Sequence, residues 1–162
     1  MAIKVLFGSV LCFCAYFIGR EFARGINERI LTVSDYILFI QTFKSSVTYS
    51  GINMFDFFAR CCGREKNFTD FLLENKSSGI KDSVENYKSQ NSVEGKCVEI
   101  IKPSLLFAQE SSDVIGIGAL LEEAVLSLEI YKKQLQEELN GKIKTAPRLA
   151  LMIGVFIAVL LV

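Results

Sequence analysis

The chain has 162 residues, of which 51% are hydrophobic, and its 18 basic and 18 acidic residues balance to a formal net charge of zero. The balanced charge provides no basic surface that would attract nucleic acid, and the chain has no acidic tail of the kind that keeps a protein solvated. No histidine is present, which excludes His-based triads, His general bases and zinc sites of mixed Cys and His ligands. The length suits one modest domain.

The first expected element is an apolar helix from Val5 to Gly19 without a charged side chain. A membrane-spanning helix needs about 20 apolar residues, so this run spans only if flanking residues, including the stems of Lys4 and Arg20, extend it. A cleaved signal peptide is the alternative, but Phe17-Ile18-Gly19 offers no small-x-small cleavage site. We therefore expect an N-terminal transmembrane helix over residues 1–19.

A basic neck follows, in which Arg20 and Arg24 stand one helical turn apart. Arginines in this position can meet anionic lipid headgroups. With Arg148, which precedes the last apolar run, they are expected at the membrane surface.

The middle of the chain shows helical periodicity from Ile30 to Tyr49, widened by aromatic residues that are expected to be core. Ser50-Gly51 ends this helix, and Asn53 is expected to cap a short aromatic helix that runs to Cys62. Further short helices are expected near Phe68–Leu73, Val84–Lys88 and Val98–Ala108, with Pro103 kinking or splitting the last. No stretch shows sustained period-two alternation, so the predicted fold is all-α.

The longest amphipathic pattern runs from Asp113 to Asn140, with Ser112 and Asp113 as N-cap candidates. One face steps by three and four residues and is expected to be a helix-packing seam that contains Val114, Ile117, Leu121, Leu128 and Leu135. The opposite face is charged and holds the candidates for contact with a partner: Glu122, Glu123, Glu129, Lys132, Lys133, Glu137 and Glu138. A stripe of this length is typical of a bundle seam or coiled coil.

The chain closes with an uncharged run from Leu149 to Val162, preceded by Pro147. We expect a second transmembrane helix there, with a buried core helix as the alternative because the run is short. The resulting domains are residues 1–19, 20–145 and 146–162. Since Lys and Arg follow the first run and precede the second, the central domain is expected in the cytoplasm and both termini across the membrane.

Nothing in the sequence assembles a catalytic or metal site. The carboxylates Glu122 and Glu123, like Glu137 and Glu138, are adjacent on a solvated face instead of converging. Of the five cysteines, the three between the apolar runs, Cys61, Cys62 and Cys97, cannot form an all-thiolate tetrahedral site. We therefore expect no enzyme activity, no cofactor and no metal.

Several individually weak motifs occur in an order that is characteristic of a known protein family. They are Gly19-Arg20 at the end of the first run, Arg29, the string Phe43-Lys-Ser-Ser-Val-Thr-Tyr49, then Asp113, Lys142 to Arg148, and Gly154 in the tail. This arrangement resembles the stage III sporulation protein AB family of endospore-forming bacteria over essentially the whole chain. The chain departs from the family pattern near Lys44 and Ser46, where the family has an acidic residue. A tryptophan that is usual in the middle helix is missing, and Tyr87 is the nearest candidate for its place. The Leu-Gly pair that the family has before the last run is Leu149-Ala150 here.

The resemblance implies a mother-cell membrane protein of the complex that links mother cell and forespore during engulfment. It implies a helical domain similar to the cytoplasmic domains of type II secretion platform proteins. The implied partners are a secretion-type ATPase and other membrane subunits, with no nucleic acid or small-molecule substrate, and self-association stays open.

The leading interpretation is a non-enzymatic platform or scaffold subunit. The alternatives are a membrane-tethered regulatory protein of another pathway and a thiol-based redox protein. The redox alternative is the weaker because vicinal cysteines lack the two-residue spacer of redox motifs.

Overall fold

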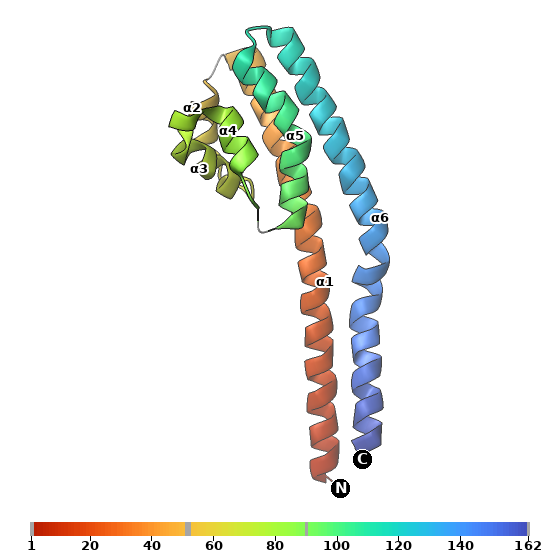
Figure 1. Cartoon of the computed structure of the whole chain (residues 1–162). Coiled ribbons are helices and arrows are strands. Elements are labelled where there is room, and N and C mark those ends of the chain that lie inside the picture. Colours follow the sequence, from red (N-terminus) through yellow and green to blue (C-terminus); the bar gives the residue numbers. More distant parts are fainter. Residues whose placement is uncertain (1, 51–52, 90, 162) are drawn as a thin grey trace. The chain divides into compact units, whose positions relative to one another are not determined.

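The computed structural model describes residues 2–50, 53–89 and 91–161, although the side chains of 2–9, 11–12, 50, 142–144, 146 and 157–161 are not described. Every regular element in these residues is a helix and none is a strand, as the sequence predicts (Figure 1). The chain divides into two compact units, which we call unit 1 (Met1–Ile30 with Gln134–Val162) and unit 2 (Leu31–Lys133). The boundary falls inside both long helices, α1 (Ala2–Ser45) and α6 (Val114–Leu161).

The prediction of transmembrane helices at the two ends is wrong for the residues that the structure describes. None of the described helices contains a stretch that is long and apolar enough to cross a membrane. The apolar runs from Val5 and from Leu149 are parts of α1 and α6, and Arg20 and Arg148 bound them within these helices. A span needs about 20 apolar residues, which is more than either run offers.

Unit 2 contains the second part of α1, all the short helices and the first part of α6. The last turn of α1 passes into a π-helical turn, Ser46–Ser50. The short elements are α2 (Met54–Phe58), α3 (Lys66–Glu74), a 3₁₀ turn (Lys76–Ser78), α4 (Gly79–Asn86) and α5 (Ser92–Glu110). Within this unit α3 contacts both α2 and α4, and α4 contacts α5.

Side-chain caps fix where three of the helices begin. Asn53 Oδ1 accepts a hydrogen bond from the Phe55 amide at 2.9 Å, and Asp113 Oδ1 accepts one from the Ile115 amide at 3.1 Å. Both caps confirm the sequence prediction. Asn91, which the sequence analysis did not single out, caps α5 through the Val93 amide at 3.0 Å.

The core of unit 2 is rich in aromatic rings, as expected. Phe39 and Phe43 of α1 lie against Phe57 of α2, with ring centroids 5.7 and 5.2 Å away, and Phe58 lies 6.0 Å from both α1 rings. All four rings are buried. Packed aromatic pairs contribute about 0.5–1.5 kcal/mol each beyond the area that they bury. This cluster therefore fastens the short helix α2 to α1.

Neither proline of the chain ends a helix. Pro103 lies inside the continuous helix α5, and Pro147 lies inside α6, which also runs through Asn140-Gly141. A proline removes one backbone hydrogen bond but does not end a helix whose flanking turns are intact. The helices of this protein are accordingly longer than the sequence punctuation indicates.

Candidate interaction surfaces

The most connected polar group in unit 2 is the carboxylate of Glu94, in the first turn of α5. Its side chain is only 8% exposed, and it accepts hydrogen bonds from the hydroxyls of Tyr36 at 3.2 Å, Tyr87 at 2.8 Å and Ser89. These donors come from α1, from the C-terminal end of α4 and from the segment that leads into α5. We call Glu94 with these three donors the Glu94 hub.

The Glu94 hub has a structural role, because the tyrosine hydroxyls that donate to Glu94 stay protonated. Burial first, and then the charge of Glu94, raise the pKa of Tyr36 above its ordinary value. Burial and the hydrogen bond to Glu94 raise the pKa of Tyr87 in the same direction. A buried carboxylate with satisfied acceptors joins elements rigidly without offering a free base. The sequence analysis missed Glu94, although its place just after the Asn91 cap is a common one for a carboxylate.

The predicted seam of α6 is placed as follows. Ile117, Leu121 and Leu128 are buried in unit 2, and Leu135 is buried in unit 1. Val114, the first residue of α6, is 43% exposed. The seam spacing of three and four residues thus coincides with burial from Ile117 onward.

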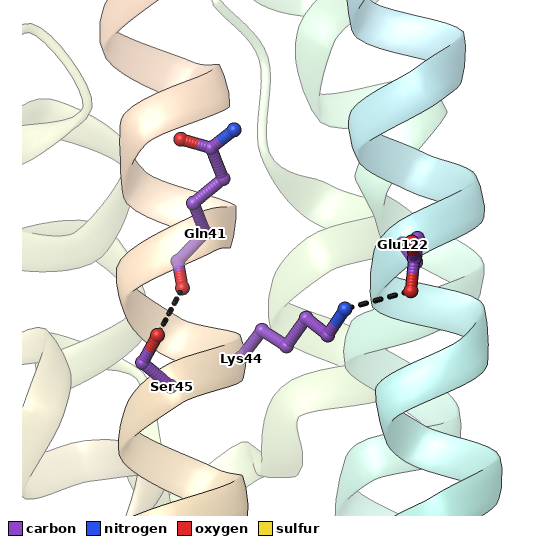
Figure 2. A network of polar contacts seen from close by, with 4 residues as sticks. All are labelled: Gln41, Lys44, Ser45 and Glu122. Carbon is purple, nitrogen blue, oxygen red and sulfur yellow. Dashed lines mark hydrogen bonds and ion pairs between the residues drawn. The ribbon is translucent and has the colours of Figure 1, made fainter.

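The charged face of α6 makes an ion pair with α1. Lys44 Nζ lies 2.7 Å from Glu122 Oε2, so α1 and α6 are joined by an ion pair; Figure 2 shows it beside the hydrogen bond from Ser45 Oγ to the Gln41 carbonyl. The hydrogen bond from Lys44, and then its charge, hold the pKa of Glu122 below its ordinary value. Of the other predicted contact residues, Lys132 is half-buried and these are exposed: Glu123, Glu129, Lys133, Glu137 and Glu138.

The sequence analysis did not anticipate a second apolar stripe on α6. Ile115, Ala119, Leu126 and Ile130 follow one another at steps of four, seven and four, and all four are exposed. Residues at these steps share one helix face. We call them the outer stripe. The sequence pattern did not reveal the outer stripe, because apolar residues on two faces of one helix are difficult to distinguish from one broad apolar face.

A groove of about 450 Å³ lies between α1 and the segment from α2 to the start of α3. Its lining includes Leu38, Phe39, Thr42, Phe57, Arg60 and Cys62. Leu38 is 63% exposed, and Asp35, another lining residue, forms an ion pair with Arg64 at 2.8 Å. We call this cavity the α1–α2 groove. It is a mainly apolar concavity with charges at its edge, a combination typical of binding sites.

Two cysteines of unit 2, Cys61 and Cys97, have raised thiol pKa values. Burial, followed by the charge of Glu65, raises the pKa of Cys61 to about 12, and burial with the charge of Glu94 raises the pKa of Cys97 to about 12. The thiolate is the nucleophilic form, so both thiols are poor nucleophiles at neutral pH. In the part of the chain that the structure describes, no group of His, Cys, Asp or Glu is arranged to hold a metal ion.

Unit 1 carries the residues predicted for the membrane surface. Arg20, Arg24 and Arg148 are all exposed, and Arg24 lies 3.8 Å from Glu21. Large apolar side chains of the same unit are also exposed, among them Phe13, Ile18, Phe22, Met152 and Phe156. A concentration of exposed apolar side chains is typical of a surface that contacts a membrane or another protein.

Comparison with models of protein families gives a match over nearly the whole chain. The family model for stage III sporulation protein AB matches residues 4–162, which is nearly the full length of the sequence. Neither the comparison with curated proteins nor the comparison with solved structures gave a match. The chain therefore belongs to the stage III sporulation protein AB family.

Proposed function

We propose that this sporulation protein is a non-enzymatic scaffold subunit of the complex that links mother cell and forespore during engulfment. Family membership supports the sporulation role. The observation that carries the scaffold role is that unit 2 holds two exposed apolar surfaces on different elements, the α1–α2 groove and the outer stripe of α6. A subunit that holds partners together needs at least two such surfaces on one compact body.

The proposed occupant of the α1–α2 groove is the secretion-type ATPase that the family resemblance implies. A groove of this kind accepts the apolar face of a helix, and the charges at its rim fix the orientation of that helix. Arg60 lines the groove and is exposed, so an acidic group of the ATPase can face it. The charged face of α6, expected from sequence to meet the ATPase, is a weaker candidate because Lys44 already holds Glu122.

The test is affinity capture of the full-length chain from sporulating cells, with the ATPase identified by mass spectrometry. Arg60→Glu is expected to lower the captured ATPase at least fivefold, because it places an acidic group opposite the proposed acidic contact. Lys81→Glu is the matched control, since it reverses an exposed cation on α4 outside the groove and is expected to leave capture unchanged. If both variants capture the same amount of ATPase, the groove is not its binding site. If the native chain captures no ATPase, the ATPase is not a partner.

The proposed location is the mother-cell membrane that faces the forespore, with unit 2 in the cytoplasm. The exposed apolar side chains of unit 1 would contact lipid, with Arg20, Arg24 and Arg148 near anionic headgroups. Flotation of the full-length chain with anionic vesicles tests this contact. Arg20→Glu with Arg24→Glu is expected to lower the floated fraction, and unchanged flotation would contradict the headgroup role.

The side of the membrane is best tested through Cys62. Cys97 is fully buried, so an impermeant thiol reagent would leave it unlabelled on either side, whereas Cys62 is exposed. In a chain with the other four cysteines replaced by serine, Cys62 is expected to react only after the cells are permeabilised. Reaction in intact cells would place unit 2 outside and exclude a cytoplasmic ATPase partner.

A further inference from the structure

We infer that the Leu126–Ile130 part of the outer stripe of α6 binds the same part of a second copy of this chain, with the two helices antiparallel. In this arrangement Leu126 packs against Ile130 of the second copy, and Glu123 lies opposite Lys133 of the second copy. The contact is isologous, so every pair occurs twice around one twofold axis. It uses only residues of unit 2 and does not depend on the identity of the ATPase.

The apolar part of the argument is the exposure of the stripe. Leu126 is 55% exposed and Ile130 is 59% exposed, in a helix whose opposite face already fills the core with Leu121 and Leu128. Full burial of a leucine or isoleucine side chain contributes about 1.5–3 kcal/mol, so leaving both in water has a cost that a partner helix removes. Their spacing of four residues is the spacing of contact positions along a helix–helix seam.

The charged part of the argument selects the second copy as the occupant. Glu123 and Lys133 flank the apolar pair, both are exposed, and neither makes an ion pair with another described residue. The pair 126 with 130 and the pair 123 with 133 are both centred on position 128. A twofold axis through this point therefore brings leucine to isoleucine and glutamate to lysine in a single register.

Other registers of the same surface are less favourable. A parallel pairing in register places Glu123 opposite Glu123 and Lys133 opposite Lys133, and like charges that face each other are destabilising. In the antiparallel register Glu129 faces position 127, which is a serine, so no like-charge pair arises there. Charges at the rim of an interface fix orientation and register more than they add affinity.

The experiment uses the full-length chain in sporulating cells, with a photoreactive benzophenone side chain at position 126. Irradiation is expected to give a covalent homodimer. The same probe at position 38, in the α1–α2 groove, is expected to give no homodimer. If the position-126 probe reaches only a different protein, or nothing at all, the proposal is overturned.

Charge reversal tests the register. With the position-126 probe present, Glu123→Lys and Lys133→Glu are each expected to lower the homodimer yield at least fivefold, since each creates two like-charge contacts. Combining the two substitutions restores opposite charges and should restore the yield, while Glu74→Lys on α3 is a matched control without effect. A double variant as weak as the single ones would overturn the antiparallel register, provided that far-UV circular dichroism shows all variants folded.

The outcomes also separate this inference from the proposed function. Loss of the homodimer in Glu123→Lys with normal ATPase capture would support the stripe as a separate contact. Loss of ATPase capture in Arg60→Glu with a normal homodimer would support the groove assignment alone. A position-126 probe that crosslinks the ATPase instead of a second copy would overturn both surface assignments.

Discussion

Tyr36 and Glu94 are 58 positions apart in the sequence, and the Tyr36 hydroxyl donates a hydrogen bond of 3.2 Å to the Glu94 carboxylate. This bond joins the C-terminal part of α1 to the first turn of α5 in the interior of unit 2. The Tyr36 ring is itself fully buried, 6.4 Å from the ring of Phe68 in α3. One side chain of α1 thus connects this helix to two others, to α3 by ring packing and to α5 through its hydroxyl.

The first prediction concerns this hydroxyl. Tyr36→Phe keeps the ring but removes a donor from a buried carboxylate, and we expect it to lower the free energy of unfolding by about 1–3 kcal/mol. Tyr49→Phe is the matched control, because Tyr49 is 87% exposed and the same atom is removed in water; its effect should stay within about 0.5 kcal/mol. Chemical denaturation measures both variants, and equal effects would contradict a structural role for the Glu94 hub.

The second prediction separates the two apolar faces of α6. Leu128 is fully buried, so Leu128→Ala should lower the free energy of unfolding by about 2–5 kcal/mol through lost contacts and a cavity. Leu126→Ala makes the same change on the outer stripe, and in the monomer it should alter stability by less than about 0.5 kcal/mol. The measurement is denaturant unfolding at a concentration low enough to exclude self-association. A small loss for Leu128→Ala would mean that the seam face is not core.

The third prediction concerns the turn into α4. Gly79 has a φ of +83°, which side chains with a Cβ rarely adopt, although no atom within 4 Å would oppose the Cβ itself. Gly79→Ala should therefore destabilise the fold by about 1–3 kcal/mol through backbone strain alone. Gly118→Ala, inside α6 with nothing within 4 Å of the new Cβ, should instead stabilise by about 0.5–1 kcal/mol. Thermal unfolding of both variants tests whether the two effects have opposite signs.

The fourth prediction concerns the ion pair between Lys44 and Glu122. The folded state holds the pKa of the Glu122 carboxyl below its unfolded value, so the pair stabilises the fold above that unfolded pKa and loses this effect as the pH falls through the folded one. The coupling is expected to be small and to weaken in high salt, because both side chains are substantially exposed. A double-mutant cycle with Lys44→Met and Glu122→Gln measures it at neutral and at acidic pH. Coupling that persists in acid would contradict the charge-based account.

The sequence by itself determined the features that depend on neighbours along the chain. The helical class follows from periodicity, and the starts of α2 and α6 follow from Asn53 and Asp113, whose side chains bond amides two residues ahead. The aromatic core also followed from spacing, because phenylalanines that recur on one helix face must be buried against something. These inferences need only local geometry and the cost of exposing apolar surface.

Only the tertiary structure decided how distant residues meet. No spacing rule places Glu94 beside Tyr36, forms the α1–α2 groove beside Leu38, or pairs Lys44 with Glu122, because each depends on how the chain returns after several intervening helices or turns. Local signals also left open whether Pro103 splits or only kinks its helix, and they overestimated the spanning capacity of the two apolar runs. A helix continues or ends according to the sum of its packing along the whole length, and that sum is a property of the folded chain.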